Sequence, residues 1–403
     1  MRDKLHPPVG GWKNSRLFWK VGIATLCRIL LNTARRFVYP FAPVLSRGLE
    51  VPLTSITSLI AINQMTGLLS PIFGLLDDRI GYRIMLLVGL GLLAGGMLTG
   101  GFFPFYGMML CAVVMAGLGK SVFDPAILAY VGKRVPYHRR GLAIGIMETA
   151  WAASTLVGIP VVGILIENFG WRAPFFVIGV LAIVGMVAIV WIMPPTRKGF
   201  NDFHRGESFR DIFGKLVEKR PVLGFLLFSF FVSMASDNFF VIYGAWLEES
   251  FNLGIVALGM MTMVIGVAEL SGEVFVAFVS DRLGLRRSII IGLVLSCASY
   301  LALPWWGPTI PQALAALFFV FVTLEFSVVT AMSLCTEILP GARATMMAGF
   351  LAAESAGRVI GAFMGGLVWE AGRIEAIVLV SAAISVLALA AFLWGMYGWR
   401  PGQ

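Results

Sequence analysis

Five of the polar side chains in the first long apolar run of this 403-residue chain, residues 18–45, cluster together on a predicted helix. Four follow the spacing i, i+4, i+7 and i+11, which places them on one face of a helix, and the fifth lies beside that face. They are Arg28, Asn32, Arg35, Tyr39 and, beside them, Arg36. Arginines in such a position can bind a carboxylate, phosphate or sulfate through paired hydrogen bonds. This face is therefore a candidate anion-binding surface.

The later apolar runs add mainly carboxylates. Their polar residues are Lys120, Asp124, Glu148, Asp237, Asn238, Glu269, Glu273, Glu325, Glu354 and Arg358. Ionisable residues inside a bilayer are costly and indicate function by default, and a carboxylate removed from water takes up a proton more readily. The proton-coupling candidates are Asp237, Glu269, Glu273, Glu148 and Glu354. The substrate-binding candidates are Arg28, Asn32, Arg35, Arg36, Tyr39, Lys120, Asp124, Asp237, Asn238, Glu325 and Arg358.

Structural ion pairs are the alternative interpretation of these charges. Lys120 with Asp124 and Glu354 with Arg358 have the i, i+4 spacing that allows neutralisation within one helix. Glu269 and Glu273 have no cation on their own helix and would repel each other if both were ionised. These two glutamates are the strongest proton-coupling candidates, with Asp237 next.

The composition places these residues in a membrane protein. The chain is 58% hydrophobic and only 13% charged, too little charge to cover a soluble particle. The three histidines fall in basic loops, and the four cysteines lie in apolar runs as small buried residues. We therefore expect no cofactor, no metal site and no enzyme. Twelve runs are long enough to cross a bilayer: 18–45, 52–76, 84–103, 105–131, 141–166, 172–193, 222–247, 255–279, 288–305, 310–337, 343–368 and 374–397.

Basic residues distinguish the two sides of the membrane. Arg47, Arg172 and Arg373 alone fall in loops of one side, and all other Lys and Arg outside the spans fall on the other. This bias places the basic side, with both termini, in the cytoplasm. It also accounts for the net charge of +9 without a nucleic-acid partner.

A charged turn between the second and third runs has a copy in the second half of the chain. The turn contains Gly74, Leu76, Asp78, Arg79, Gly81 and Arg83, and the copy contains Asp281, Arg282 and Gly284. Asp281 follows Asp78 by 203 residues, as Arg343 follows Arg140, Gly361 follows Gly158 and Gly366 follows Gly163. The interval predicts two similar halves, 1–193 and 222–403, joined by a polar linker, 194–221.

The turn between the second and third of twelve spans, with its degenerate copy, resembles the signature of the major facilitator superfamily. The resemblance covers essentially the whole chain and is greatest for bacterial twelve-span efflux permeases. It implies an all-α fold of two six-helix bundles that rock about a midplane site. It also implies that Asp78 faces the start of span eleven near Arg343, and Asp281 the start of span five near Arg140. The implied gating residues are Gly74, Asp78, Arg79, Gly81, Arg83, Asp281, Arg282, Gly284, Arg140 and Arg343.

The predicted function is proton-coupled transport of a small organic solute across the inner membrane by a monomer, with efflux favoured. Proton-coupled uptake of an organic anion is the alternative, indicated by the arginine face. Flipping of an amphipathic lipid is a third possibility. A membrane sensor without transport is a fourth, although the longest polar loop is too short for an appended soluble domain.

Overall fold

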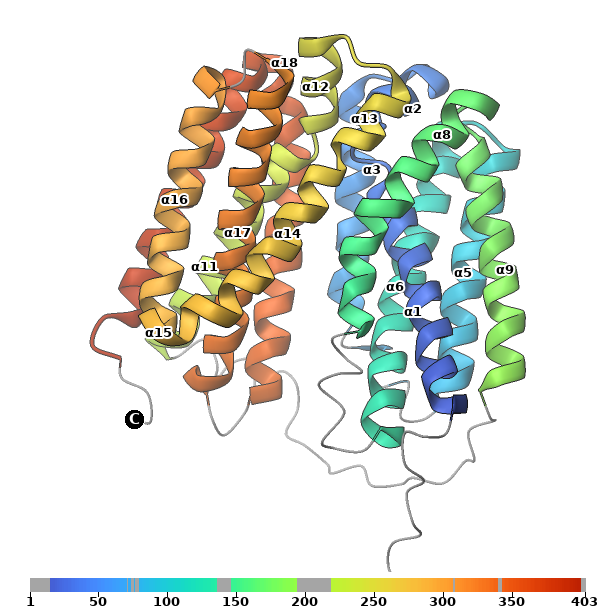
Figure 1. Ribbon diagram of the computed structural model, residues 1–403, viewed down its shortest axis with the longest axis horizontal. Coiled ribbons are helices and arrows are strands. Elements are labelled where there is room, and N and C mark those ends of the chain that lie inside the picture. Colours follow the sequence, from blue (N-terminus) through green and yellow to red (C-terminus); the bar gives the residue numbers. More distant parts are fainter. Residues whose placement is uncertain are drawn as a thin grey trace, which may run out of the picture.

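The computed structural model describes residues 15–70, 72–73, 76, 80–135, 146–193, 219–306, 309–339 and 343–399. Within these residues the regular structure is entirely helical. Figure 1 shows two bundles side by side, one formed by the first half of the chain (blue to green) and one by the second (yellow to red). Helix α1 (Ser15–Arg36) begins at one end of the molecule, and helix α18 (Arg343–Met396) finishes at that same end. We call it the terminal end.

The first bundle continues after α1 with a short helix, a broken second span and four longer helical segments. These are α2 (Ala42–Leu49), α3 (Leu53–Met65) with the 3₁₀ turn η1 (Thr66–Leu69), α5 (Tyr82–Phe102), α6 (Tyr106–Arg134), the segment Ile146–Phe169 with its π-helical turn η2 (Ser154–Gly158) and α8 (Ile159–Phe169), and α9 (Ala173–Ile192).

The second bundle begins with α11 and also contains a π-helical turn. Its elements are α11 (Arg220–Phe240), α12 (Tyr243–Phe251), α13 (Ile255–Met261), α14 (Met263–Phe275), the π turn η3 (Val276–Ser280), α15 (Asp281–Leu283), α16 (Leu285–Trp306), α17 (Ile310–Ile338) and α18.

These helices occupy the predicted spans. In the described residues nine segments are long and apolar enough to cross a membrane, and the longest contains non-helical residues at Gly372 and Arg373, so it crosses twice. Helix α1, with its polar face, and the shorter apolar segment Leu53–Leu69 occupy the first two predicted spans. A bilayer core favours helices because each satisfies its own backbone polar groups. The predicted all-α fold is confirmed.

The backbone repeats at the interval found in the sequence. Gly81 has a φ of 97° just before α5, and Gly284, 203 residues later, has a φ of 84° just before α16. Gly170 and Arg373 are related by the same interval and also have positive φ, 84° and 52°. This region of φ favours glycine because it has no Cβ. The two halves therefore share turn geometry as well as sequence motifs.

Glycines allow the two bundles to approach closely at the end opposite the terminal end. A Cβ on Gly163 of α8 would lie 3.3 Å from the carbonyl oxygen of Ile255 in α13. At the related position in α18, a Cβ on Gly366 would overlap Thr57 of α3. A Cβ on Gly244 of α12 would overlap the backbone of Pro40. Small residues at such crossings are how membrane helices pack without a hydrophobic driving force.

Replacing Gly244 by Val should therefore separate the bundles at this end, because the side chain would collide with the backbone of Pro40. Gly254→Val is the matched control, since nothing lies within 4 Å of its Cβ position. Spin labels at the exposed residues Glu167 and Glu375, in a background lacking the native cysteines, measure the separation. We expect a longer distance in the Gly244 variant only, and equal distances in both variants would contradict the close contact.

Candidate functional site

The polar face of α1 contacts both bundles. Arg28 and Asn32 interact with the first bundle, whereas Arg36 and Tyr39 reach α14 and α11 of the second. All four are buried, with at most 8% of each residue exposed. The predicted helical face is therefore a line of contacts through the interior of the molecule.

Within the first bundle the charges neutralise one another. Arg28 Nη1 lies 2.8 Å from Glu148 Oε1, and Arg28 Nε lies 3.2 Å from Asp124 Oδ1. Lys120 Nζ lies 2.6 Å from Asp124 Oδ2 and donates a hydrogen bond to Asn32 Oδ1 at 2.7 Å. The structure thus contains the predicted i, i+4 pair of Lys120 with Asp124 and adds Arg28 to it.

A second ion pair joins the two bundles. Arg36 binds Glu269 of α14 through two hydrogen bonds, Nη2 to Oε1 at 2.6 Å and Nη1 to Oε2 at 3.2 Å. The Trp151 indole N–H also donates to Glu269 Oε1 at 3.2 Å, and the guanidinium lies 4.2 Å above the Trp151 ring. Only 2% of the Arg36 side chain and 7% of the Glu269 side chain are exposed. We call this the Arg36–Glu269 bridge.

This bridge corrects one inference from the sequence. Glu269 has no cation on its own helix, as the sequence indicates, but α1 supplies one from the other bundle. Glu273, one turn further on, is exposed and makes no ion pair or hydrogen bond within the described residues. The two glutamates are therefore in different environments, one paired with a cation of the other bundle and one exposed.

A hydrogen-bond network through the uncharged side chains of Gln64 and Tyr39 makes the second connection between the bundles. Gln64 Nε2 donates to the Tyr39 hydroxyl at 2.5 Å, and that hydroxyl donates to Asp237 Oδ1 of α11 at 3.1 Å. Arg35 Nη2 donates to Gln64 Oε1. On the far side, Arg358 Nε of α18 lies 3.6 Å from Asp237 Oδ2. We call this chain of contacts the Gln64 network.

A cavity of about 200 Å³ lies between the bundles, next to these contacts. Arg35, Lys120 and Asp124 line it from the first bundle, and Glu354 and Arg358 from the second. Arg358 Nη2 also lies 3.1 Å from Glu354 Oε1, the second pair predicted at i, i+4. A polar cavity bounded by both bundles is the arrangement that a midplane solute site requires.

Two further candidates, Asn238 and Glu325, belong neither to this cavity lining nor to the contacts that join the bundles. Asn238 donates to Ile377 O at 3.3 Å and to Ser381 Oγ at 2.9 Å, so its amide joins α11 to α18 within the second bundle. Glu325 of α17 packs closely against Gly272 of α14, where an added Cβ would lie 2.7 Å from the Cβ of Glu325. The Glu325 carboxylate makes no ion pair among the described residues. Both remain candidates from sequence alone.

The predicted gating turn is described only in part. Gly74, Asp78, Arg79 and Arg140, and the side chains of Asp281 and Arg343, lie outside the described residues. Gly81 and Gly284 have matching positive φ, and Arg282 is exposed. Arg83 Nη2 donates to Val190 O at 2.7 Å, which ties the start of α5 to the end of α9. The expected positions of Asp78 at the start of span eleven and of Asp281 at the start of span five stay predictions.

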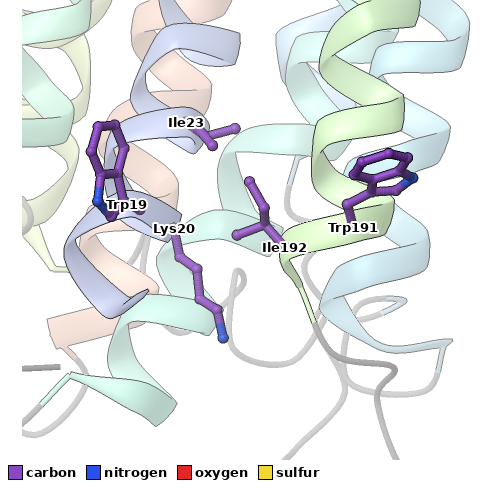
Figure 2. Close-up of a pocket in the computed structure, with 5 residues that line it drawn as sticks. All are labelled: Trp19, Lys20, Ile23, Trp191 and Ile192. Carbon is purple, nitrogen blue, oxygen red and sulfur yellow. The ribbon is translucent and has the colours of Figure 1, made fainter. Parts of the chain in front are cut away.

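A larger groove on the outside of the first bundle is of a different kind. It has a volume of about 490 Å³ and lies between the start of α1 and the end of α9. Figure 2 shows Trp19, Lys20 and Ile23 on α1 and Trp191 and Ile192 on α9. Trp and Lys are the side chains favoured where a helix meets the lipid headgroups. This groove matches the membrane interface, whereas the central cavity matches a solute site.

The family model of the Major Facilitator Superfamily matches residues 24–236 and 225–402. The chain belongs to the Major Facilitator Superfamily. It is a multi-pass membrane transporter of this superfamily and not an enzyme, as the sequence predicted.

Similar superfamily members come from several bacteria. The chain is 26% identical over 304 residues to the uncharacterized MFS-type transporter YceJ of Bacillus subtilis, covering 74% of this chain and 76% of the relative. It is 25% identical over 303 residues to the multi-drug resistance efflux pump PmrA homolog of Lactococcus lactis, covering 72% of each. It is 27% identical over 311 residues to the multidrug resistance protein MdtG of Citrobacter koseri, covering 71% and 74%.

Solved superfamily structures share the fold. A bacterial homolog of the human lysosomal transporter Spinster, in an inward-facing and unoccupied conformation, superposes with a TM-score of 0.82 at 15% identity, over 96% of this chain and all of that chain. A mutant of the nucleoside transporter NupG superposes with a TM-score of 0.79 at 13% identity, over 94% and 99%. At these identities the likeness supports the fold alone.

Two residues of the site were not identified from the sequence. Gln64 is a buried amide in the second apolar run, next to the buried amide of Asn63, and Trp151 is an aromatic residue one turn beyond Glu148. Gln64 could have been found, because a polar amide inside a membrane span needs hydrogen-bond partners. Trp151 could not, because aromatic residues are common in such helices.

The Arg36–Glu269 bridge predicts a specific stability pattern. Arg36→Met leaves a buried carboxylate without its cation and should reduce the free energy of unfolding by about 3–5 kcal/mol. Adding Glu269→Leu should recover most of that loss. Thermal unfolding in detergent measures both. Arg47→Met is the control, because its pair with Glu248 is 61% exposed on the arginine side and should contribute about 1 kcal/mol or less. Equal losses at Arg36 and Arg47 would contradict the buried bridge.

Proposed function

We propose that this chain is a proton-coupled secondary transporter that exports a small organic solute by alternating access. The moving bodies are the halves 1–193 and 222–403, joined by 194–221. The repeated turns and the glycine contacts between the bundles support this division. The central cavity, lined by both halves, supplies the solute site. Rocking of one half against the other would expose that site to each side in turn.

The Arg36–Glu269 bridge is the observation that carries the proposal. It crosses between halves that must move, and its carboxylate is buried. Arginine stays protonated in proteins, so only Glu269 can exchange a proton within the pair. A neutral Glu269 loses the ionic attraction to Arg36, which lowers the free energy needed to separate the halves. Proton uptake and the change of access are thereby coupled.

Export is favoured by what the relatives are named for. The similar proteins from Lactococcus lactis and Citrobacter koseri are called a multi-drug resistance efflux pump homolog and a multidrug resistance protein. Antiport fits the bridge, because a proton entering from outside would occupy Glu269 while the halves are apart at the end opposite the termini. Uptake of an organic anion is the second candidate, and Arg35 at the cavity favours it.

The proposed location is the bacterial inner membrane, as a monomer with the terminal end in the cytoplasm. The bias of basic residues toward that end supports the orientation. The three basic residues of the other end all have local partners: Arg47 with Glu248, Arg172 with Gly101 O, and Arg373 with Glu249. Two of them are thus paired with a carboxylate, and the third is hydrogen-bonded to a carbonyl oxygen.

This orientation can be tested by labelling single cysteines in intact cells with a membrane-impermeant thiol reagent. A cysteine at the exposed residue Glu167, at the end opposite the termini, should react from outside. A cysteine at the exposed residue Arg287, at the terminal end, should react only after permeabilisation. The reverse pattern would invert the proposed topology.

The coupling role of Glu269 is tested by Glu269→Gln, which keeps the shape but cannot ionise. In proteoliposomes, with a solute selected by its thermal stabilisation of the wild type, we expect transport driven by a pH gradient to fall at least about tenfold. Counterflow without a gradient should stay within about twofold, because exchange needs no net proton movement.

Glu167→Gln is the matched control, since Glu167 is exposed and far from the cavity along α8. It should retain both activities. Gradient-driven transport at the wild-type rate in the Glu269 variant would remove Glu269 from the coupling mechanism. Absence of saturable counterflow for any solute would instead reject the transporter mechanism as a whole.

A further inference from the structure

Arg35 differs from the other cations that line the central cavity. Lys120 pairs with Asp124, and Arg358 pairs with both Asp237 and Glu354. Within the described residues, the Arg35 side chain makes one hydrogen bond and no ion pair, and its partner is the neutral amide of Gln64. Among the described residues, no carboxylate therefore pairs directly with Arg35, and Asp237 and Asp124 attract it only from a greater distance.

The Gln64 network fixes this arrangement. The Gln64 amide N–H₂ donates to the Tyr39 hydroxyl at 2.5 Å and approaches Asp237 Oδ1 at 3.5 Å. With its nitrogen committed to these oxygens, the amide presents its own oxygen to Arg35. Only 1% of Gln64 is exposed, so it has little freedom to turn. Arg35 is thus held in place by a group that leaves its charge uncompensated.

Arg35 has N–H donors that are free to bind an anion. A guanidinium has five N–H donors in a planar fork that matches carboxylate and phosphate oxygens, and one donor is occupied here. A cation among membrane helices is costly unless an opposite charge is near. The nearby carboxylates Asp124, Asp237 and Glu354 are already engaged with other cations. In the part of the chain that the structure describes, this leaves Arg35 without a directly paired anion, a place that a ligand could fill.

We propose that Arg35 binds the carboxylate or phosphate group of the transported solute. The inference rests on the proposed function, in which this cavity is the solute site. A volume of about 200 Å³ suits a compact organic acid, with Trp151 beside its body and the Ser355 hydroxyl at the cavity wall. Because Gln64 also contacts Tyr39 and Asp237, an anion that draws Arg35 away from Gln64 disturbs a contact between the halves.

Thermal unfolding of the purified full-length chain in detergent tests this without any gradient. The probes are benzoate and phenylphosphonate, with benzamide and benzylamine as the neutral and cationic counterparts of similar size. We expect the two anions to raise the unfolding temperature in a saturable way, and the other two to leave it unchanged. Stabilisation by benzamide equal to that by benzoate, or none by either anion, would overturn the proposal.

Three variants assign the effect to Arg35. Gln64→Glu should supply an internal carboxylate to Arg35 and raise the half-saturating benzoate concentration at least about tenfold, and Arg35→Gln should do the same. Arg287→Gln, an exposed cation outside the cavity, should leave it unchanged. Should Arg35→Gln fail to fold, Gln64→Glu decides alone, because it retains the side-chain length.

Wild-type benzoate affinity in Gln64→Glu would overturn the assignment. The result is separable from the coupling test, because binding in detergent involves no proton gradient. If anions bind through Arg35 but transport by the Glu269→Gln variant still follows the pH gradient, this inference stands and Glu269 has no coupling role. If instead the Glu269→Gln variant loses gradient-driven transport and no anion binds through Arg35, the coupling role of Glu269 stands and the anion site is rejected.

Discussion

The neutralisation of charge away from water is the constraint on which the interior of this transporter depends. Each half is unbalanced in the interior of its spans: away from the span ends, the first carries four cations and two carboxylates, and the second one cation and five carboxylates. Local pairs relieve part of this imbalance, as Lys120 does with Asp124. The rest is relieved across the interface, where Arg36 of α1 meets Glu269 of α14. A lone buried charge is far costlier than a paired one. The excess charge of each bundle therefore favours contact with the opposite charge of the other bundle.

The backbone geometry repeats between the two halves, whereas the buried charges do not. Turn geometry repeats between the halves, as Gly81 and Gly284 show, and so do the close contacts at Gly163 and Gly366. The charges do not repeat, because the position related to Arg36 is Phe239. Repeated backbone allows the two halves to move alike. Because the charges do not repeat, the bridge has its cation in one half and its carboxylate in the other.

Much of the fold could be predicted from the sequence, because hydropathy and the 203-residue interval are properties of single segments. The polar face of α1 and the pairs at i, i+4 were predictable for the same reason. The partners across the interface were not. That Glu269 meets Arg36 depends on how two helices 233 residues apart cross, and spacing along either helix carries no such information. The buried amide of Gln64 indicates that it needs partners, but the sequence does not show that Tyr39, Arg35 and Asp237 supply them.

The place where α1 ends explains how Arg35 and Arg36 can share one turn with different partners. Neighbouring residues on a helix point about 100° apart, so one guanidinium reaches Glu269 and the other faces the cavity. Both stand in the last turn, where the helix dipole places about half a negative charge. That partial charge stabilises two adjacent cations inside the membrane, but it cannot balance both in full. Arg36 completes its balance with Glu269, and Arg35 keeps a residual positive charge at the cavity. The cavity lining and the contact between the halves therefore meet at a single helix end.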